Sequence, residues 1–290
     1  MMDLVEATLK KPAVGTLRIY ETREALAHAA AELICETAVL KSGPVRIALC
    51  GGTTPQPAYE LLAQDPLLRR LPWSRVHWII GDERFVKPSH PASNFGMVQR
   101  AFLSRAPAPH ENVHAIPTEG IDLEDAAAQY DTRLKQLYGA ETLRMDRPLF
   151  DLTLLGIGDD SHTASLLVDH PVLDERDRWV APVYSKLQPR LTLTYPALES
   201  SRVAAFIVAG EDKREILDPR AHRRCEHTRR APAPHRRCAL ARRSGRRRAL
   251  VLTLPRSSGT GCGRSFPQRR LLDLHRPLLP PTRAQRVNAA

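Results

Sequence analysis

FDLTLLGIGDDSHTASLL, at residues 150–167, joins an apolar run to a glycine-rich, acidic turn that contains one histidine. A short apolar run that ends at glycine is typical of a buried strand in a parallel sheet. Gly156 and Gly158 allow a tight exit from this strand, where a side chain would clash. The Asp-Asp-Ser segment at 159–161 can cap a helix, which we expect to begin near Thr163.

His162 lies at the exit of this strand, and strand exits are where ligands bind in α/β sheets. A histidine ordinarily has a pKa of about 6.5, so its ring can accept a proton near neutral pH. Asp160, two residues earlier, can orient the ring or raise its basicity. From spacing alone, an ordinary surface histidine beside two capping aspartates is the simpler interpretation.

The same order of strand, turn and helix recurs up to residue 218. We expect helices over about 23–41, 56–64, 95–102 and 123–138, and strands around 17–20, 45–50, 76–80, 113–116, 150–155, 179–183 and 203–208. A further helix is expected to start in the REIL segment at 214–217. This alternation predicts an α/β fold with a parallel sheet covered by helices on both faces.

GGTTP, at residues 51–55, follows the expected strand at 45–50 and precedes a helix. Gly51 and Gly52 let backbone N–H groups approach a phosphate, Thr53 can donate a hydroxyl, and the start of the helix adds partial positive charge. A tight turn without a ligand explains the segment equally well. It is neither a Walker loop nor GxGxxG, so no nucleotide cofactor is indicated.

Charged residues follow two more of the expected strands: the triplet Asp-Glu-Arg at 82–84, and Lys213. Such a cluster is costly unless it is paired or faces a polar cleft, although a solvated loop is the usual explanation. Arg84 can bind a phosphate or carboxylate with its planar guanidinium group. Because right-handed connections place all strand-end loops on one side, these residues should converge with GGTTP and His162.

The length of 290 residues suffices for one large or two modest domains. No apolar stretch approaches the roughly 18 residues needed to span a bilayer, so we expect no membrane association. The first 15 residues contain no continuous apolar segment typical of a secretory signal. Cys35 and Cys50 lie in apolar segments, as expected for reduced core residues of a cytoplasmic protein.

The formal net charge of +11 is divided unevenly along the chain. Residues 219–290 contain 19 arginines, no lysine and two acidic residues, whereas residues 1–218 contain 24 basic and 30 acidic residues. We therefore expect a folded, acidic domain over residues 1–218. The basic tail over residues 219–290, rich in arginine and proline, is expected to be irregular or disordered.

Five ordered motifs resemble the 6-phosphogluconolactonase family, which is related to glucosamine-6-phosphate deaminases and ribose-5-phosphate isomerases. The resemblance covers roughly residues 16–217. Its motifs are GGTTP (51–55), DERFV followed by SNF (82–86 and 93–95), LGIGDDSHTASL (155–166), PRLTLTYPAL (189–198) and VAGEDKREIL (208–217). It implies a Rossmann-like fold and hydrolysis of 6-phospho-D-glucono-1,5-lactone to 6-phospho-D-gluconate in the oxidative branch of the pentose phosphate pathway. It implies no metal and no nucleotide cofactor.

The resemblance also assigns roles to residues. His162 matches the proposed general base, which would take a proton from water as that water attacks C1 of the lactone. Asp160 matches the aspartate beside it, and Arg84 is expected to be a third catalytic residue. The residues expected to bind the substrate and its phosphate are Gly51, Gly52, Thr53, Asp82, Arg190 and Lys213. Lactone hydrolysis needs a positioned water, a base and a donor for the oxyanion, and a phosphate needs basic side chains.

The central motif departs from the family pattern GxDGHTASLFP. Ser161 replaces a glycine, Asp159 stands where proline is common, and residues 167–168 replace Phe-Pro. A left-handed backbone at Ser161 would cost on the order of 1 kcal/mol and would affect the aim of His162. Related deaminases are the closest alternative, but they typically follow the histidine with Phe-Asn-Glu-Pro. TASL at this position favours a lactonase.

Three interpretations of residues 219–290 are open. Arginine clusters can bind nucleic acid and would make the chain a non-enzymatic binding protein, but the single aromatic residue, Phe266, disfavours base stacking. A second interpretation is a metal site formed by Cys225, His227, His235 and Cys238. The spacing of these residues matches no common zinc site. We favour a shift of reading frame near Leu217, which would leave the domain without the last strand and helix of the family.

Overall fold

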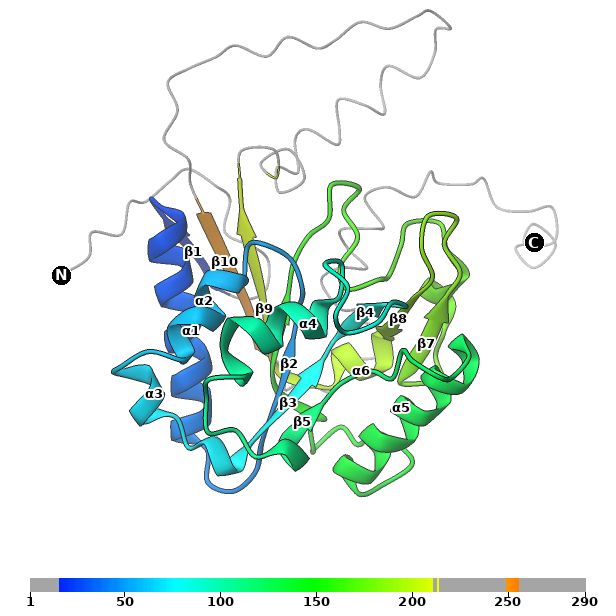
Figure 1. The fold of residues 1–290 in the computed structure, drawn as a ribbon, viewed down its shortest axis with the longest axis horizontal. Helices are drawn as coiled ribbons and strands as arrows, with labels where there is room; N and C mark the ends of the chain where they lie inside the picture. Colours follow the sequence, from blue (N-terminus) through cyan, green and yellow to red (C-terminus); the bar gives the residue numbers. More distant parts are fainter. Residues whose placement is uncertain (1–15, 211–212, 214–248, 256–290) are drawn as a thin grey trace, which may run out of the picture.

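The computed structural model describes residues 16–210, Lys213 and residues 249–255. Its centre is a seven-stranded sheet with the order β1-β10-β9-β6-β2-β3-β5 (Figure 1). The bounds of these strands are β1 Thr16–Tyr20, β2 Val45–Leu49, β3 Val76–Ile80, β5 Val113–His114, β6 Phe150–Leu155, β9 Ser201–Ala209 and β10 Ala249–Pro255. The run from β9 to β5 is parallel, and β10 pairs antiparallel with both β1 and β9. The predicted mostly parallel α/β sheet is confirmed.

Helices flank this sheet. Their bounds are α1 Arg23–Leu40, α2 Gln56–Leu62, α3 Leu67–Arg70, α4 Asn94–Val98, α5 Leu123–Tyr138 and α6 Tyr195–Glu199. The helices predicted over 23–41 and 123–138 are confirmed. The Thr22 side chain caps α1 by accepting a hydrogen bond from the Ala25 N–H (3.1 Å). Such a cap satisfies one of the backbone donors that a helix start leaves unpaired.

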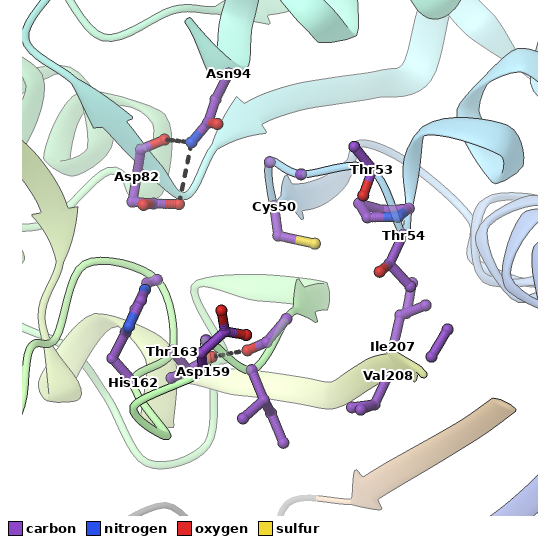
Figure 2. Close-up of a pocket in the computed structure, with 18 of the residues that line it drawn as sticks. Cys50, Thr53, Thr54, Asp82, Asn94, Asp159, His162, Thr163, Ile207 and Val208 are labelled. Atoms are coloured by element: carbon purple, nitrogen blue, oxygen red, sulfur yellow. Dashed lines mark hydrogen bonds between the residues drawn. The ribbon is translucent and has the colours of Figure 1, made fainter. Parts of the chain in front are cut away.

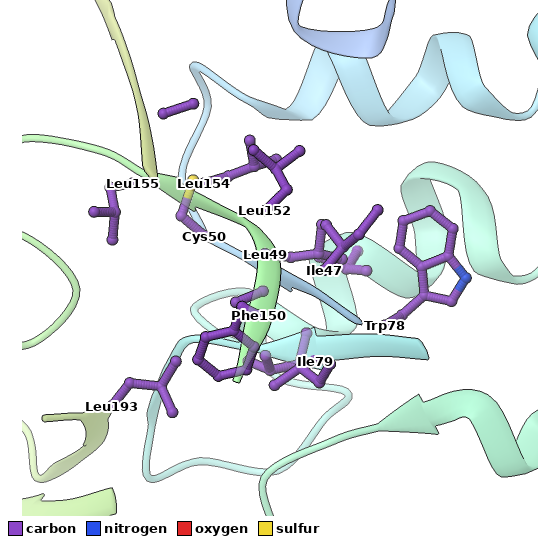
Figure 3. Close-up of a cluster of buried hydrophobic side chains, with 14 of the residues drawn as sticks. Ile47, Leu49, Cys50, Trp78, Ile79, Phe150, Leu152, Leu154, Leu155 and Leu193 are labelled. Carbon is purple, nitrogen blue, oxygen red and sulfur yellow. The ribbon is translucent and has the colours of Figure 1, made fainter. Parts of the chain in front are cut away.

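Apolar side chains from neighbouring parallel strands form the core (Figure 3). All six residues of β6 are buried, as expected for a central strand with both faces covered. Ile47 of β2 and Trp78 of β3 are fully buried, and the Trp78 ring packs edge-on against Phe102 with 4.9 Å between ring centroids. This core holds the carboxyl ends of β2, β3 and β6 at one edge of the sheet.

A second, smaller sheet lies beside the first, with the order β4-β8-β7 and antiparallel pairing. Its strands are β4 Asp82–Arg84, β8 Arg190–Leu193 and β7 Val180–Val183. Gly81 connects the two sheets, because its N–H donates to the Leu49 carbonyl and its own carbonyl accepts from the Leu193 N–H (2.9 Å each). The charged triplet 82–84 is therefore a short strand rather than the loop expected from the sequence.

The helix expected near Thr163 is absent, so that prediction is wrong. Residues 156–170 form an irregular loop with a single isolated bridge between Thr163 and Leu166. Ser161, Ala164 and Asp169 have positive φ angles of 71°, 49° and 60°. A left-handed residue interrupts a right-handed α-helix, so three of them within nine residues exclude one here.

Residues 249–255 are an exception to the irregular tail expected from composition, because they form β10 between β1 and β9. The other residues of the tail lie outside the described residues. The same holds for the helix expected at 214–217 and for the proposed nucleic-acid and metal interpretations of the tail. The division at residue 218 and the shifted reading frame stay predictions.

Among residues 16–210, 213 and 249–255, the structure contains no helix long and apolar enough to cross a membrane. Cys35 and Cys50 are both buried and carry free thiols.

A chain of hydrogen bonds links two histidines on β3 and β5. The Arg133 Nε–H donates to His114 Nδ1 (3.4 Å), and His114 Nε2 lies 3.1 Å from His77 Nδ1. Because arginine can only donate, His114 Nδ1 must accept, so its Nε2 carries the hydrogen and donates to His77. Both rings are therefore neutral, and a proton added to either accepting nitrogen would remove a hydrogen bond.

Acid should destabilise the protein through His114. Burial, followed by the charges of Arg133 and His77, lowers the pKa of His114 to about 4, whereas an unfolded histidine has a pKa of about 6.5. The unfolded state therefore takes up the proton first as the pH falls. The free energy of unfolding should be intact above about pH 6.5 and should fall by on the order of 1–3 kcal/mol towards about pH 4.

Urea unfolding of wild type and His114→Gln between about pH 7 and about pH 4 checks this expectation. The variant should lose less stability on acidification than the wild type. His28→Gln, at an exposed position of α1, is the matched control and should keep the wild-type loss. An undiminished loss in His114→Gln would contradict the assignment.

The position of β10 predicts that its backbone N–H groups stabilise the domain. Val251 lies opposite both Arg18 of β1 and Ile207 of β9. Val251→Pro should lower the free energy of unfolding by on the order of 1–3 kcal/mol, because proline removes a ladder hydrogen bond. Val251→Thr keeps the N–H and should melt at a higher temperature than Val251→Pro. Equal melting of the two variants would show that this segment does not pair.

Candidate active site

A cavity of about 430 Å³ opens at the carboxyl ends of β2, β6 and β9 (Figure 2). Residues of the second sheet, from β4 and β8, complete its wall. Eight of the nine predicted site residues line it: Gly51, Gly52, Thr53, Asp82, Arg84, His162, Arg190 and Lys213. The ninth, Asp160, does not line the cavity but is hydrogen-bonded to His162, which does. The predicted convergence of the strand-end loops is confirmed by this arrangement.

The GGTTP turn lines one side of the cavity, between the end of β2 and the start of α2. Gly52 has a φ of 99°, which favours glycine. A side chain at Gly51 would collide with the carboxamide of Asn94, so this position admits only glycine without displacement of that group. The turn therefore exposes backbone to the cavity, with Thr53 and Thr54 beside it.

Two arginines from the second sheet occupy paired positions of neighbouring strands and line the cavity. Arg84 of β4 pairs directly with Arg190 of β8 in the antiparallel register, and both line the cavity. Arg84 Nη1 donates to the carbonyl of Ala92 (2.8 Å) and to Asn94 Oδ1 (2.9 Å), which are uncharged acceptors. Arg190 Nε is buried and has no hydrogen-bond partner in the structure. Two like charges held side by side in this way attract an anion.

Glu83, between Asp82 and Arg84, holds the segment that follows. Its side chain is only 1% exposed and accepts hydrogen bonds from the Ser93 hydroxyl (3.0 Å) and from the N–H groups of Asn94 and Phe95 (2.7 Å each). Burial raises the pKa of the Glu83 carboxyl, and these hydrogen bonds offset part of that rise. Glu83 is thus a structural residue that fixes the start of α4 and, through it, Asn94.

Asn94 in turn forms hydrogen bonds with both ends of β4. Its Nδ2 donates to the Asp82 carbonyl (2.7 Å) and its Oδ1 accepts from Arg84. The Asp82 side chain is 7% exposed and accepts a hydrogen bond from the Ser165 hydroxyl (2.7 Å), while the Ser165 N–H donates to Thr192 Oγ1 (3.1 Å). These bonds tie the loop that carries the histidine to β4 and β8.

His162 lies in the loop after β6 and points into the cavity (Figure 2). Its Nδ1 is hydrogen-bonded to a carboxylate oxygen of Asp160. Partial burial tends to raise the pKa of Asp160, but the hydrogen bonds and charge of His162 outweigh it, and the pKa is lowered overall. An ionised Asp160 can only accept, so the proton resides on Nδ1 and Nε2 keeps its lone pair.

The backbone around His162 is closed into a tight turn. The Gly158 N–H donates to the His162 carbonyl (2.7 Å), and the Ser161 N–H donates to the Gly158 carbonyl (3.1 Å). A side chain at Gly158 would collide with the imidazole ring. Ser161 adopts the left-handed conformation that its replacement of glycine had suggested, and His162 nevertheless reaches both Asp160 and the cavity.

Lys213 reaches the cavity after β9, where its ammonium group forms an ion pair with Asp159. The sequence singled out Lys213 but gave Asp159 only a capping role. It also missed Asn94, Gly158, Ser165 and the cavity-lining Arg23 as site residues. The SNF motif pointed to Asn94 and the glycine turn to Gly158. Arg23 carried no signal, because its link to the site is formed only when α1 packs beside GGTTP.

The part of the chain that the structure describes contains no group of three or more histidine, cysteine, aspartate or glutamate side chains able to hold a metal ion. Burial raises the pKa of the Cys50 thiol, which lines the cavity, to about 12, so this cysteine is an inert thiol near neutral pH.

Comparisons with known proteins agree with this geometry. The family model of glucosamine-6-phosphate isomerases/6-phosphogluconolactonase matches residues 21–243. The chain is 38% identical to a 6-phosphogluconolactonase of Nostoc sp. over 205 residues, covering 70% of this chain and 83% of that protein. It is 33% identical to the human 6-phosphogluconolactonase over 214 residues, covering 71% and 81%.

A solved structure is similar as well. The crystal structure of 6-phosphogluconolactonase from Leishmania guyanensis matches with a TM-score of 0.61 and 27% identity, covering 69% of this chain and 85% of that one. Fold, cavity and sequence agree, and the chain belongs to the glucosamine-6-phosphate isomerase/6-phosphogluconolactonase family.

Proposed function

We propose that this protein hydrolyses 6-phospho-D-glucono-1,5-lactone to 6-phospho-D-gluconate in the pentose phosphate pathway. Relatives from Nostoc sp. and human that carry the name 6-phosphogluconolactonase support the reaction. The observation that carries it is the His162–Asp160 pair, which faces a cavity also lined by Arg84, Arg190 and Lys213. A base and several cations in one cavity suit a phosphorylated ester.

His162 is the general base. Asp160 holds the proton on Nδ1, so Nε2 takes a proton from a water molecule as the water oxygen attacks the lactone carbonyl carbon. The resulting imidazolium is stabilised by the Asp160 carboxylate. When the tetrahedral intermediate collapses, the bond between the carbonyl carbon and the ring oxygen breaks and His162 returns the proton to that oxygen. The product is an open-chain carboxylic acid, which releases its proton to solvent and becomes the carboxylate at neutral pH.

Arg84 stabilises the negative charge that develops on the carbonyl oxygen. Two fixed acceptors, the Ala92 carbonyl and Asn94 Oδ1, hold Nη1 and so restrict the guanidinium before substrate arrives. A donor that is already oriented costs little reorganisation in the transition state, and such donors are a large source of rate enhancement. Asp82, anchored by Ser165, forms the polar wall beside it and contacts the sugar hydroxyls.

The phosphate binds between the GGTTP turn and the remaining cations. Gly51, Gly52 and Thr53 present backbone and hydroxyl donors, and Arg190 and Lys213 supply charge. The Arg190 guanidinium, which lines the cavity, donates charge-assisted hydrogen bonds to the phosphate oxygens. No nucleotide or metal is required by this scheme.

We place the reaction in the cytoplasm. The two buried free thiols, Cys35 and Cys50, suit a reducing compartment.

Replacement of the base tests the mechanism. His162→Ala should lower kcat for the lactone by about 10²- to 10⁴-fold and change KM little, because the imidazole acts in the transition state. Asp160→Asn should lower kcat by a smaller factor, because the base remains but its proton is no longer held on Nδ1. Initial rates, corrected for uncatalysed hydrolysis, measure both. His110→Ala, at an exposed position away from the cavity, is the control. A His162→Ala enzyme with wild-type turnover would rule out this base.

Phosphate recognition by Arg190 gives a different signature. Arg190→Gln should raise KM for the phosphorylated lactone by about 10- to 100-fold, because a charge-assisted hydrogen bond contributes about 1.5–3 kcal/mol. Hydrolysis of the unphosphorylated lactone should be affected far less. Arg69→Gln removes an exposed arginine paired with Asp65 and should leave both substrates unaffected. Equal losses on both lactones would place Arg190 at the reacting end instead.

A further inference from the structure

The ion pair between Asp159 and Lys213 occupies the cavity in which the phosphate is proposed to bind. Both residues line the cavity, and the Lys213 Nζ donates to Asp159 Oδ1. The two side chains differ in exposure: Lys213 is 13% exposed, whereas Asp159 is 95% exposed. The cation is therefore held in the wall of the site, while its partner projects into open solvent.

Asp159 comes from the same turn as the catalytic base (Figure 2). The hydrogen bonds of Gly158 with the His162 carbonyl and of Ser161 with the Gly158 carbonyl close this turn around residue 159. The backbone of Asp159 is therefore fixed relative to His162, and only its side chain has freedom to move. A carboxylate is thus held within reach of Lys213 by the architecture of the catalytic loop.

We propose that Asp159 is an internal competitor of the substrate's phosphate group for Lys213, and that it limits how tightly phosphorylated ligands bind. This inference rests on the proposed function, because it takes Lys213 as a phosphate ligand. A phosphate oxygen that approaches the ammonium group must either displace the carboxylate or share the cation with it. Displacement breaks an ion pair, and sharing places two anions side by side, so each route weakens phosphate binding.

The exposure of Asp159 makes displacement feasible. An exposed carboxylate that leaves an ion pair returns to water at little cost, because water solvates the freed charge. Asp82, the other carboxylate of the cavity, contrasts with it. Asp82 is 7% exposed and is held by Ser165, so it is a fixed part of the wall. Of these two carboxylates, Asp159 is therefore the one that can exchange with a ligand.

Exchange at Lys213 also favours product release. The product carries the same phosphate as the substrate and one further negative charge, so the cations of the cavity attract it strongly. As the phosphate leaves, Asp159 restores its ion pair with Lys213. The expected benefit is faster dissociation of the product, because changes in affinity among related complexes lie mainly in the dissociation rate.

Asp159→Asn separates this role from others, because asparagine keeps the shape of the side chain and removes its charge. We expect the variant to bind inorganic phosphate and 6-phosphogluconate about two- to tenfold more tightly than wild type, as measured by titration calorimetry. Asp169→Asn is the matched control, since Asp169 is an exposed aspartate of the same loop that does not line the cavity. It should bind both ligands as wild type does.

A second background tests whether Lys213 carries the effect. In Lys213→Met, the further change Asp159→Asn should alter phosphate affinity by less than about twofold, because the contested cation is gone. The inference is overturned if Asp159→Asn binds phosphate no more tightly than wild type, if Asp169→Asn tightens it equally, or if the gain persists without Lys213.

Calorimetry with inorganic phosphate does not require turnover, so this result is independent of the proposed reaction. If the wild type does not hydrolyse the lactone but Asp159→Asn binds phosphate more tightly, the proposed reaction is rejected and the competition for Lys213 stands. If the wild type hydrolyses the lactone but Asp159→Asn binds phosphate no more tightly, the competition is rejected and the reaction stands.

Discussion

The parallel pairing of β6 with both β2 and β9 is the constraint on which the site depends. In register, Leu152 lies opposite Ile47 on one side and Val203 on the other, so the three strands end at the same edge. The GGTTP turn, the histidine loop and Lys213 follow these ends directly. Two buried polar side chains of β6 fix this register: Asp151 accepts from the Arg46 N–H of β2 (2.9 Å), and the Thr153 hydroxyl is hydrogen-bonded to the Ser201 hydroxyl of β9 (2.7 Å). A slip by one residue would turn both side chains to the other face of the sheet and break these bonds. Catalytic geometry is therefore set by the core.

The second sheet contributes the two arginine side chains of the site. A parallel sheet edge offers turns and backbone N–H groups, but Arg84 and Arg190 come from antiparallel strands placed against that edge. The buried Glu83 and the contacts of Asn94 join β4 to α4, and Ser165 joins the histidine loop to Asp82. Because these hydrogen bonds are buried, loss of one partner would leave an unsatisfied polar group, and the network acts as a unit. The network fixes the positions of His162 and the two arginines relative to one another. Asp159, in contrast, is exposed and can exchange between Lys213 and water.

Several features were predictable because they depend on neighbouring residues. The spacing of apolar residues and the Thr22 cap predicted α1, and apolar runs that end at glycine predicted β2 and β6. The loop after β6 was mispredicted as a helix. Asp159, Asp160 and Ser161 resemble a helix cap, but the Asp159 side chain pairs with Lys213, and the Asp160 side chain binds the ring and the N–H of His162. Competition between local capping and distant partners cannot be resolved from the local sequence.

The sequence by itself determined the main α/β alternation, eight of the residues that line the cavity and the family, because each follows from local periodicity, turn chemistry or ordered motifs. Only the tertiary structure decided that residues 82–84 form a strand, that Arg84 lies opposite Arg190, that β10 lies between β1 and β9, and that Asp159 pairs with Lys213. Some of these contacts join residues that are more than 200 positions apart in the sequence. Their energies arise when strands pair and side chains meet across the sheet edge, and no local pattern encodes which distant partner will be there.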